Sequence, residues 1–495
     1  MTSSKNLNVT LAFLGVFLLC AFFADFSITT LDPISEMKNF FGGVLQIDIL
    51  KTPIYFDAVV NTICIAMVAI FISAILGFFF ALYFHYTAVR ISLAFTRAIH
   101  ELFWALIFLQ IFGLNTLTAL LAIVIPYSAT LGKVYSEILE EYDVFPKELQ
   151  SRKASKVSIF LFTKLPDAMP HLISYTMYRF ECALKSTAVL GFVGLTTLGY
   201  YLHGSFMQGF YGEVWLLLII FYLIIITLKY WFTKYSAPFL LLFSFFYLDD
   251  FSGFNIDNLI RFLTFDIIPS PIRKEQSLSE TYFWFENIFA NEIMPGILNT
   301  IVLTQVSLIV TALIALLSFP LISRKFVSRP SAMGGNILLV VLRSTPEYIL
   351  AYLFLQIWGP SMFPAVIALA LHNGAIIGHI MGHQSNELIL RPDATKKKIE
   401  LYTYEVCPRI YGSFLAFLFY RWEVIMRESA ILGILGIATL GFFIDSAIAD
   451  IRLDKVVILL IFTASLNILV DFISRKVRNY LRLDTTIKND CSCTI

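Results

Sequence analysis

A succession of long apolar runs is the feature that most constrains this chain. A helix that crosses a bilayer needs about 20 mostly apolar residues, and about twelve runs of that kind can be read from the sequence. They lie near residues 8–28, 57–85, 91–113, 115–137, 169–198, 212–233, 236–250, 293–320, 336–358, 362–382, 410–440 and 454–474. We therefore predict an all-α integral membrane protein with about twelve transmembrane helices.

Composition supports lipid as the solvent. The chain has 495 residues, of which 58% are hydrophobic and 14% charged, whereas soluble domains are about one quarter charged. The net charge of +1 gives no indication of a nucleic-acid partner. The first apolar run lacks a small-residue cleavage site, so we expect a membrane anchor rather than a signal peptide.

The distribution of Lys and Arg between the predicted loops sets the orientation. Cytoplasmic loops of membrane proteins are enriched in these residues. With the N-terminus inside, the cluster at 133–164, the run 396–398 and the tail from Arg475 all face the cytoplasm. The segments 29–56 and 251–292, which hold few basic residues, then lie outside. Both termini are expected to be cytoplasmic.

An internal repeat divides the chain. Residues 178–199 align with 420–441, and residues 97–113 align with 343–359, with charged residues in register. We predict a first unit at 1–234, a second unit at 235–482 and a cytoplasmic tail at 483–495. Six spans in each copy would insert both the same way up, with a pathway between the halves.

Charged residues recur at equivalent places in the two copies. Charges within spans are costly and usually face a protein interior or a water-filled cavity. Three explanations stay open: structural ion pairs between helices, basic residues that line a route for an anion, or side chains that reach back to the interface. Glu181 and Lys185 are four residues apart, as are Glu423 and Arg427, so each pair shares a helix face. The candidate pathway residues are Arg179, Glu181, Lys185, Arg421, Glu423, Arg427, Arg97, Arg343 and Glu347.

Three glycines follow the charged segment in each copy. They permit either close helix packing or a bend that could gate the pathway. These glycines are Gly191, Gly194, Gly199, Gly433, Gly436 and Gly441.

Signatures of enzymes are missing from the sequence. There is no G-x-x-x-x-G-K-[ST] phosphate loop, so the chain is not expected to hydrolyse ATP. No H-E-x-x-H, no G-x-S-x-G and no Cys/His cluster with metal-ligand spacing is found. We expect no catalytic residue, no cofactor and no metal on this chain.

The charged loop 132–166, which ends in Leu-Pro, resembles the cytoplasmic loop of ABC importer permeases. The stretches Ile173–Gly199, Arg343–Glu347, Leu371–Asn373 and Tyr420–Glu423 resemble the phosphonate-type permease subunit in particular. This resemblance implies the type I importer fold, with two permease units fused in one chain. It further implies two copies of a separate ATPase subunit that bind ATP and Mg, an external solute-binding protein, and a bacterial inner-membrane location.

The resemblance also implies where the ATPase would bind. The coupling loops fall at about 138–165 and 383–407, and His383 and Asn386 belong to the second. Lys153 stands where the family usually has Gly, and Gly194–Gly199 and Gly436–Gly441 depart from its glycine pattern. The second loop is shorter and lacks the Gly-Ala-Ser signature. The carried-over coupling residues are Glu137, Glu140, Ala154, Ser155, Pro166, Ala394, Glu405 and Pro408.

The predicted function is therefore the membrane permease of an importer for phosphonate or another small phosphorus oxyanion. Two alternatives stay open: the same machine with a different small nutrient, and a stand-alone secondary transporter.

Overall fold

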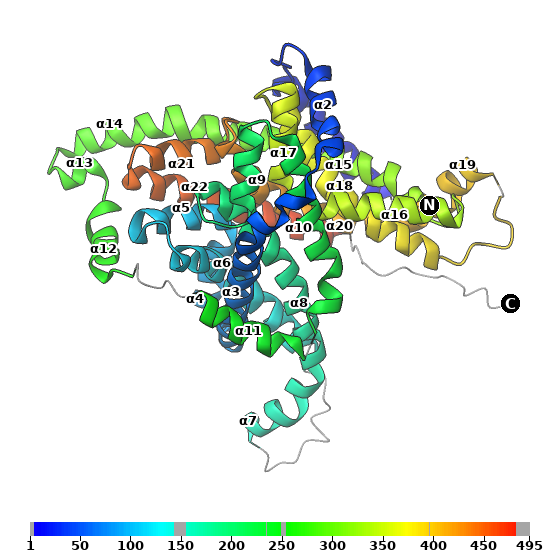
Figure 1. Cartoon of the computed structure of the whole chain (residues 1–495), viewed down its shortest axis with the longest axis horizontal. Helices are drawn as coiled ribbons and strands as arrows, with labels where there is room; N and C mark the ends of the chain where they lie inside the picture. Colours follow the sequence, from blue (N-terminus) through cyan, green and yellow to red (C-terminus); the bar gives the residue numbers. More distant parts are fainter. Residues whose placement is uncertain (1–3, 143–154, 234, 249–253, 396, 482–495) are drawn as a thin grey trace. The chain divides into compact units, whose positions relative to one another are not determined.

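The computed structural model describes residues 4–142, 155–233, 235–248, 254–395 and 397–481. Every regular element within these ranges is a helix (Figure 1). In a bilayer, backbone N–H and C=O groups must be paired within the protein, and a helix pairs them within one segment. The all-α prediction is therefore confirmed for the described residues.

Seven of the described helices or helical segments are long and apolar enough to cross a membrane. They match predicted runs and comprise Lys5–Phe23, Ile49–Leu82, Thr116–Glu141, Tyr211–Trp231, Leu278–Leu321, Met362–Glu387 and Leu453–Leu481. Three bent helix pairs raise the number to as many as ten. The run at 236–250 is a helix of only 12 residues, α11 (Ser236–Tyr247).

Two predicted spans are broken rather than straight. In place of 91–113, α4 (Thr87–Ala98) and α5 (Glu101–Phe112) meet at 89°. In place of 336–358, α16 (Arg329–Ser344) and α17 (Glu347–Trp358) meet at 92°. The two residues at each break have extended backbones, and one of them, Pro346, has no N–H to continue a helix.

The chain forms two compact units. One consists of residues 38–268, called the 38–268 unit below. The other consists of residues 269–495 together with residues 1–37, called the 269–495 unit below.

The centre of the 38–268 unit is built from three packed helices. They are α3 (Phe56–Leu82), α6 (Thr116–Glu141) and α8 (Leu165–Leu190), and α5 and α11 pack around them. Many of its buried residues form an apolar cluster. The unit also contains α9 (Leu198–Met207), α10 (Tyr211–Trp231), α12 (Ile256–Arg261) and the short α7 (Lys156–Ile159).

The 269–495 unit has a centre of the same kind. Here α15 (Met294–Ser318), α18 (Met362–Glu387) and α20 (Cys407–Ile434) pack together, with α17 beside them. The N-terminal helix α1 (Ser4–Phe23) packs against α15, and its Phe13 ring lies 5.0 Å from Phe419. The remaining helices are α13 (Ser270–Arg273), α14 (Leu278–Ile288), α19 (Lys398–Glu400), α21 (Leu440–Ala449) and α22 (Leu453–Leu481). The boundary between residues 37 and 38 falls within α2 (Pro33–Gly42).

The glycine segments fold tightly in both units. A Cβ on Gly191 would lie 2.1 Å from the backbone nitrogen of Tyr200, and one on Gly433 would lie 2.1 Å from that of Phe442. The middle glycine of each segment, Gly194 or Gly436, has a positive φ that reverses the chain. These glycines allow the chain to pack against itself after α8 and after α20.

A threonine on the neighbouring helix pins each of these turns. The Thr62 hydroxyl on α3 accepts the Leu198 N–H at 3.0 Å, and the Thr300 hydroxyl on α15 accepts the Leu440 N–H at 3.1 Å. The amide of Asn299 also donates to the Ala438 carbonyl at 2.8 Å. Backbone groups that the turn leaves without a helical partner are thereby satisfied.

Replacing Gly191 with Ala should destabilise the protein, because the added methyl group would overlap backbone atoms of the following turn. We expect a loss of about 1–3 kcal/mol, measured as a lower thermal midpoint in detergent. Gly412→Ala is the matched control, since a Cβ there meets nothing within 4 Å. Equal stability of the two variants would contradict this account of the turn.

Candidate functional site

The paired Arg and Glu residues flank the breaks in the two bent helix pairs. Arg97 and Arg343 lie in the last turns of α4 and α16, while Glu101 and Glu347 lie in the first turns of α5 and α17. A cation near a helix C-terminus and an anion near an N-terminus are each favoured by the helix dipole. Local helix electrostatics therefore accounts for the repeated Arg-x-x-x-Glu spacing.

In the 38–268 unit, Glu101 begins a chain of hydrogen bonds. The Ser186 hydroxyl on α8 donates to the Glu101 carboxylate at 2.6 Å, and the Tyr127 and Ser186 hydroxyls lie 2.9 Å apart. The Arg179 guanidinium stacks on the Tyr127 ring, 4.2 Å from its centroid. Arg179 is thus connected to Glu101 through two neutral side chains.

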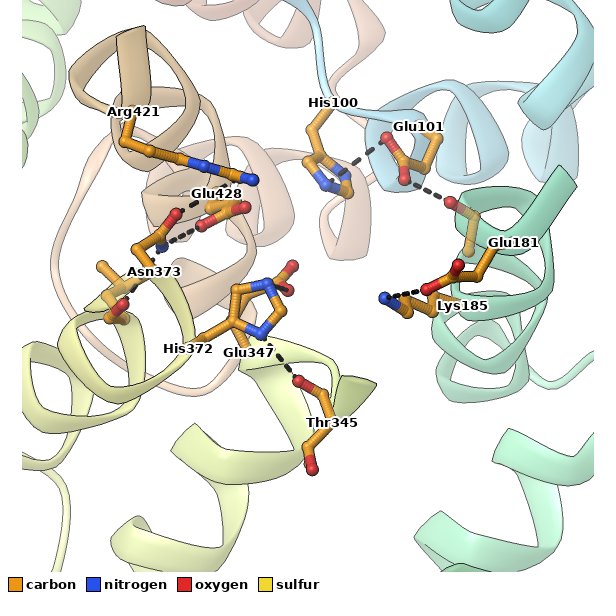
Figure 2. Close-up of polar contacts among 12 residues, drawn as sticks. His100, Glu101, Glu181, Lys185, Thr345, Glu347, His372, Asn373, Arg421 and Glu428 are labelled. Atoms are coloured by element: carbon orange, nitrogen blue, oxygen red, sulfur yellow. Dashed lines mark hydrogen bonds and ion pairs between the residues drawn. The ribbon is translucent and has the colours of Figure 1, made fainter. Parts of the chain in front are cut away.

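Equivalent positions of the 269–495 unit carry different chemistry (Figure 2). Glu347, His372 and Glu428 lie together, with donor atoms within 4.8 Å of one another. The Asn373 amide donates to Glu428 at 2.8 Å, and its oxygen lies 3.5 Å from the Arg421 guanidinium. The sequence offered no spacing that joins these residues, because they come from three helices.

The predicted pairing of Glu181 with Lys185 is confirmed by a distance of 3.2 Å between their charged groups. Both side chains are partly buried on α8. The corresponding pairing of Glu423 with Arg427 stays a prediction. Because Lys185 is already paired, an anion that binds it must compete with Glu181.

The predicted coupling residues of the first loop that the structure describes are exposed. Glu137 and Glu140 are exposed at the end of α6, and Lys133 lies 3.8 Å from Glu137. Ser155 accepts the Ser158 N–H and so begins α7, while Pro166 is exposed at the start of α8. Ala154 lies outside the described residues.

The second coupling loop is held by an internal ion pair. Glu405 is buried, with its carboxylate 2.7 Å from the Arg409 guanidinium and 3.7 Å from that of Arg391. Ala394 packs on the apolar cluster, and Pro408 is partly buried. Glu405 therefore fixes the shape of this loop.

Lys325 is a functional candidate that the sequence analysis missed. Its ammonium donates to the carbonyls of Ser385, Asn386 and Leu388 at the end of α18. Burial, with a further contribution from the positive charge of Arg409, lowers the pKa of Lys325. The last carbonyls of a helix have no helical partner, so this lysine caps α18 where the second coupling loop begins.

Large apolar side chains are exposed on both coupling loops. Val157 and Phe162 are 66% and 81% exposed in the first, and Ile399 and Tyr404 are each 78% exposed in the second. The two pairs occupy equivalent positions of the aligned copies. In loops that are expected to face the cytoplasm rather than lipid, exposed apolar groups are typical of a protein interface.

Replacing Lys325 with Met should loosen the start of the second coupling loop, because three carbonyls lose a charged donor. We expect a loss of about 2 kcal/mol and faster proteolysis within residues 383–407. Arg324→Met, at an exposed neighbour, is the control. Unchanged protection of the loop in the Lys325 variant would show that the cap is dispensable.

Comparison with known proteins finds relatives of one kind. A phosphate-import permease of Mycolicibacterium smegmatis is 23% identical over 396 residues, which cover 74% of this chain and 72% of that protein. A phosphite transport system permease of Stutzerimonas stutzeri is 25% identical over 166 residues, or 32% of this chain and 60% of that one.

A further protein from Stutzerimonas stutzeri, named as a phosphite transport permease, is 32% identical over 146 residues. This match spans 29% of the present chain and 56% of the relative. The sequence matches no protein-family model. No solved structure matches it either. By sequence, the chain is a relative of phosphite and phosphonate transport permeases, which confirms the resemblance noted from its motifs.

Proposed function

We propose that this protein is the transmembrane permease subunit of an ATP-binding cassette importer for phosphonate or a related small phosphorus oxyanion. The observation that carries the proposal is the alignment with a phosphate-import permease over 396 residues, because it extends through most of the chain. The protein would lie in the bacterial inner membrane. A separate ATPase subunit would bind ATP and Mg and hydrolyse the ATP.

The proposal includes two fused permease units, 1–234 and 235–482. Together they contain twelve membrane spans. Recurrent features within each compact unit support the duplication: a helix pair bent near 90°, a pinned glycine turn and a Glu-centred polar network. The first helices also behave alike. The first helix of the first repeat, α1, packs on α15 of the second repeat. The first helix of the second repeat, α11, packs on α3 of the first repeat.

The first helix of each repeat would thus pack against the core of the other repeat. This exchange reconciles the proposed boundary at 234/235 with the compact units, which divide at 37/38 and 268/269. It also favours a single functional body over two separable halves.

The ATPase contacts would be the exposed apolar side chains of the two coupling loops. Val157 and Phe162 in one loop match Ile399 and Tyr404 in the other, so two copies of the ATPase are expected to bind. Both loops, and both termini, would then lie in the cytoplasm, as the distribution of Lys and Arg indicates.

The proposed pathway residues centre on Arg179 and Arg421. A guanidinium offers a planar fork that suits phosphoryl oxygens. Arg179 stacks on a tyrosine ring and Arg421 lies at an asparagine oxygen. An anion released by an external binding protein would meet Arg179 beside a neutral ring. At Arg421 it would have to compete with the Glu428 carboxylate, to which Asn373 is also bonded.

Replacing both Arg179 and Arg421 with Gln should abolish phosphonate uptake while assembly persists. Uptake would be measured in proteoliposomes that contain the ATPase and receive the binding protein. Arg261→Gln, at a side chain that is 71% exposed on α12, is the control and should transport normally. Normal uptake by the double variant would exclude an anion route at these residues, and loss of assembly would favour a structural role.

Replacing Phe162 or Tyr404 with Asp should remove one ATPase each, because a charge would disrupt the apolar contact. Mass measurement of the purified complex should show two ATPase copies with the native chain, one with either variant and none with both. Leu278→Asp, at a 90% exposed residue of the predicted outer segment, should keep two. Two copies retained by the double variant would contradict docking at these side chains.

A further inference from the structure

A mixed cluster of two carboxylates and an imidazole lies inside the 269–495 unit. Glu347 comes from the first turn of α17, His372 from α18 and Glu428 from α20 (Figure 2). Their donor atoms all lie within 4.8 Å of one another. His372 is 6% exposed and Glu428 is 9% exposed. Buried carboxylates are paired or bind a cation, and Glu428 is connected to the Arg421 guanidinium through Asn373.

The hydrogen bonding of His372 fixes which nitrogen faces the carboxylates. Its Nδ1 lies 2.8 Å from the Thr345 carbonyl oxygen, in the break between α16 and α17. A carbonyl oxygen only accepts, so Nδ1 carries the proton, and Nε2 of the neutral ring presents a lone pair. Nε2 lies 3.9 Å from a Glu347 oxygen. With the ring neutral, two electron-pair donors face each other across a gap longer than a hydrogen bond; with the ring protonated, Nε2 would pair with the carboxylate.

His100, at the equivalent break in the 38–268 unit, has the opposite arrangement. Its Nδ1 accepts the backbone N–H of Leu102 at 3.2 Å, so Nε2 of the neutral ring carries the proton. That Nε2 lies 3.4 Å from Glu101. Here a donor faces an acceptor, and no third species is needed between the imidazole and the carboxylate.

The second carboxylate is also peculiar to the 269–495 unit. The position aligned with Glu428 is Ser186 in the other copy, and its hydroxyl donates to Glu101. Compared with Ser186, Glu428 therefore lacks a hydroxyl donor and carries a negative charge. Asn373 holds this carboxylate in place through a hydrogen bond of 2.8 Å to one oxygen, and a carboxylate oxygen of Glu428 also lies among the donor atoms of the cluster.

This arrangement has the parts of a metal site. Carboxylate and imidazole ligands bind first-row divalent ions at about 2.0–2.2 Å. A backbone carbonyl on the far nitrogen of the histidine, and a hydrogen-bonded carboxylate, are the outer contacts that usually orient such ligands. Modest rotation of the three side chains would bring all the donor atoms onto one ion.

We propose that Glu347, the Nε2 atom of His372 and Glu428 bind one first-row divalent transition ion, such as Mn²⁺ or Zn²⁺, within the 269–495 unit. The ion joins α17, α18 and α20 and fixes the bent helix pair in this half of the chain. The proposal does not depend on the transported solute.

The test is metal binding by the full-length purified chain. Protein treated with a chelator is dialysed against Mn²⁺ or Zn²⁺, and the bound metal is then measured by elemental mass spectrometry. Cys491→Ser and Cys493→Ser are included in every sample, so that tail thiols do not contribute. We expect one ion per chain and a rise in thermal midpoint on adding metal.

Two variants remove a ligand, and two serve as controls. Glu428→Gln keeps the size of the side chain, and Glu428→Ser copies the residue that the other half tolerates at this position. Both should weaken binding by about 10- to 100-fold or more. His100→Gln and His383→Gln should retain the ion; the second tests the neighbouring His379 and His383 rings on α18, which lie 4.7 Å apart.

Failure of the native chain to retain either ion would overturn the proposal, as would equal retention by the Glu428 variants. Stabilisation that depends on pH but not on metal would assign a shared proton to the cluster instead. Loss of the ion from His383→Gln, with retention by Glu428→Ser, would place the metal on the histidine pair and also refute the assignment.

Discussion

The need to pair every backbone polar group away from water governs this structure. Long helices satisfy the need without further help. The breaks between α4 and α5 and between α16 and α17 do not, and each is accompanied by buried polar side chains. His100 accepts an N–H at the first break, and His372 reaches the carbonyl of Thr345 at the second. The polar chemistry of the protein is therefore concentrated where its helices stop.

This constraint also explains why the two halves can diverge without losing their shape. The glycine turns, held by Thr62 and Thr300, are nearly the same in both. The networks around Glu101 and Glu347 contain different residues: the Ser186 hydroxyl donates to Glu101, whereas His372 and Glu428 lie beside Glu347. Turns that require close backbone contact tolerate few residue types, whereas a polar network requires only that donors and acceptors balance.

Much of the fold could be predicted because an apolar run of membrane length pairs its backbone polar groups by forming a helix. The pairing of Glu181 with Lys185 followed from helical spacing alone. The right-angled bends were not predicted, although polar residues interrupt both runs at 97–101 and 343–347 and Pro346 disfavours a continuous helix. The cluster of Glu347, His372 and Glu428 depends on how three helices pack, and no local pattern encodes that. Glu405 was expected at a partner's surface, but it is buried against two arginines.

The packing of α1 on α15 has a consequence for how the chain is made. α1 is synthesised before the 38–268 unit, whereas α15, the helix that it contacts, follows the whole of that unit. At ordinary translation rates the delay is on the order of ten seconds or more. During that time α1 must remain in the bilayer without its contact to α15. Its surface suits this, since only 6% of its apolar window is buried even in the finished fold.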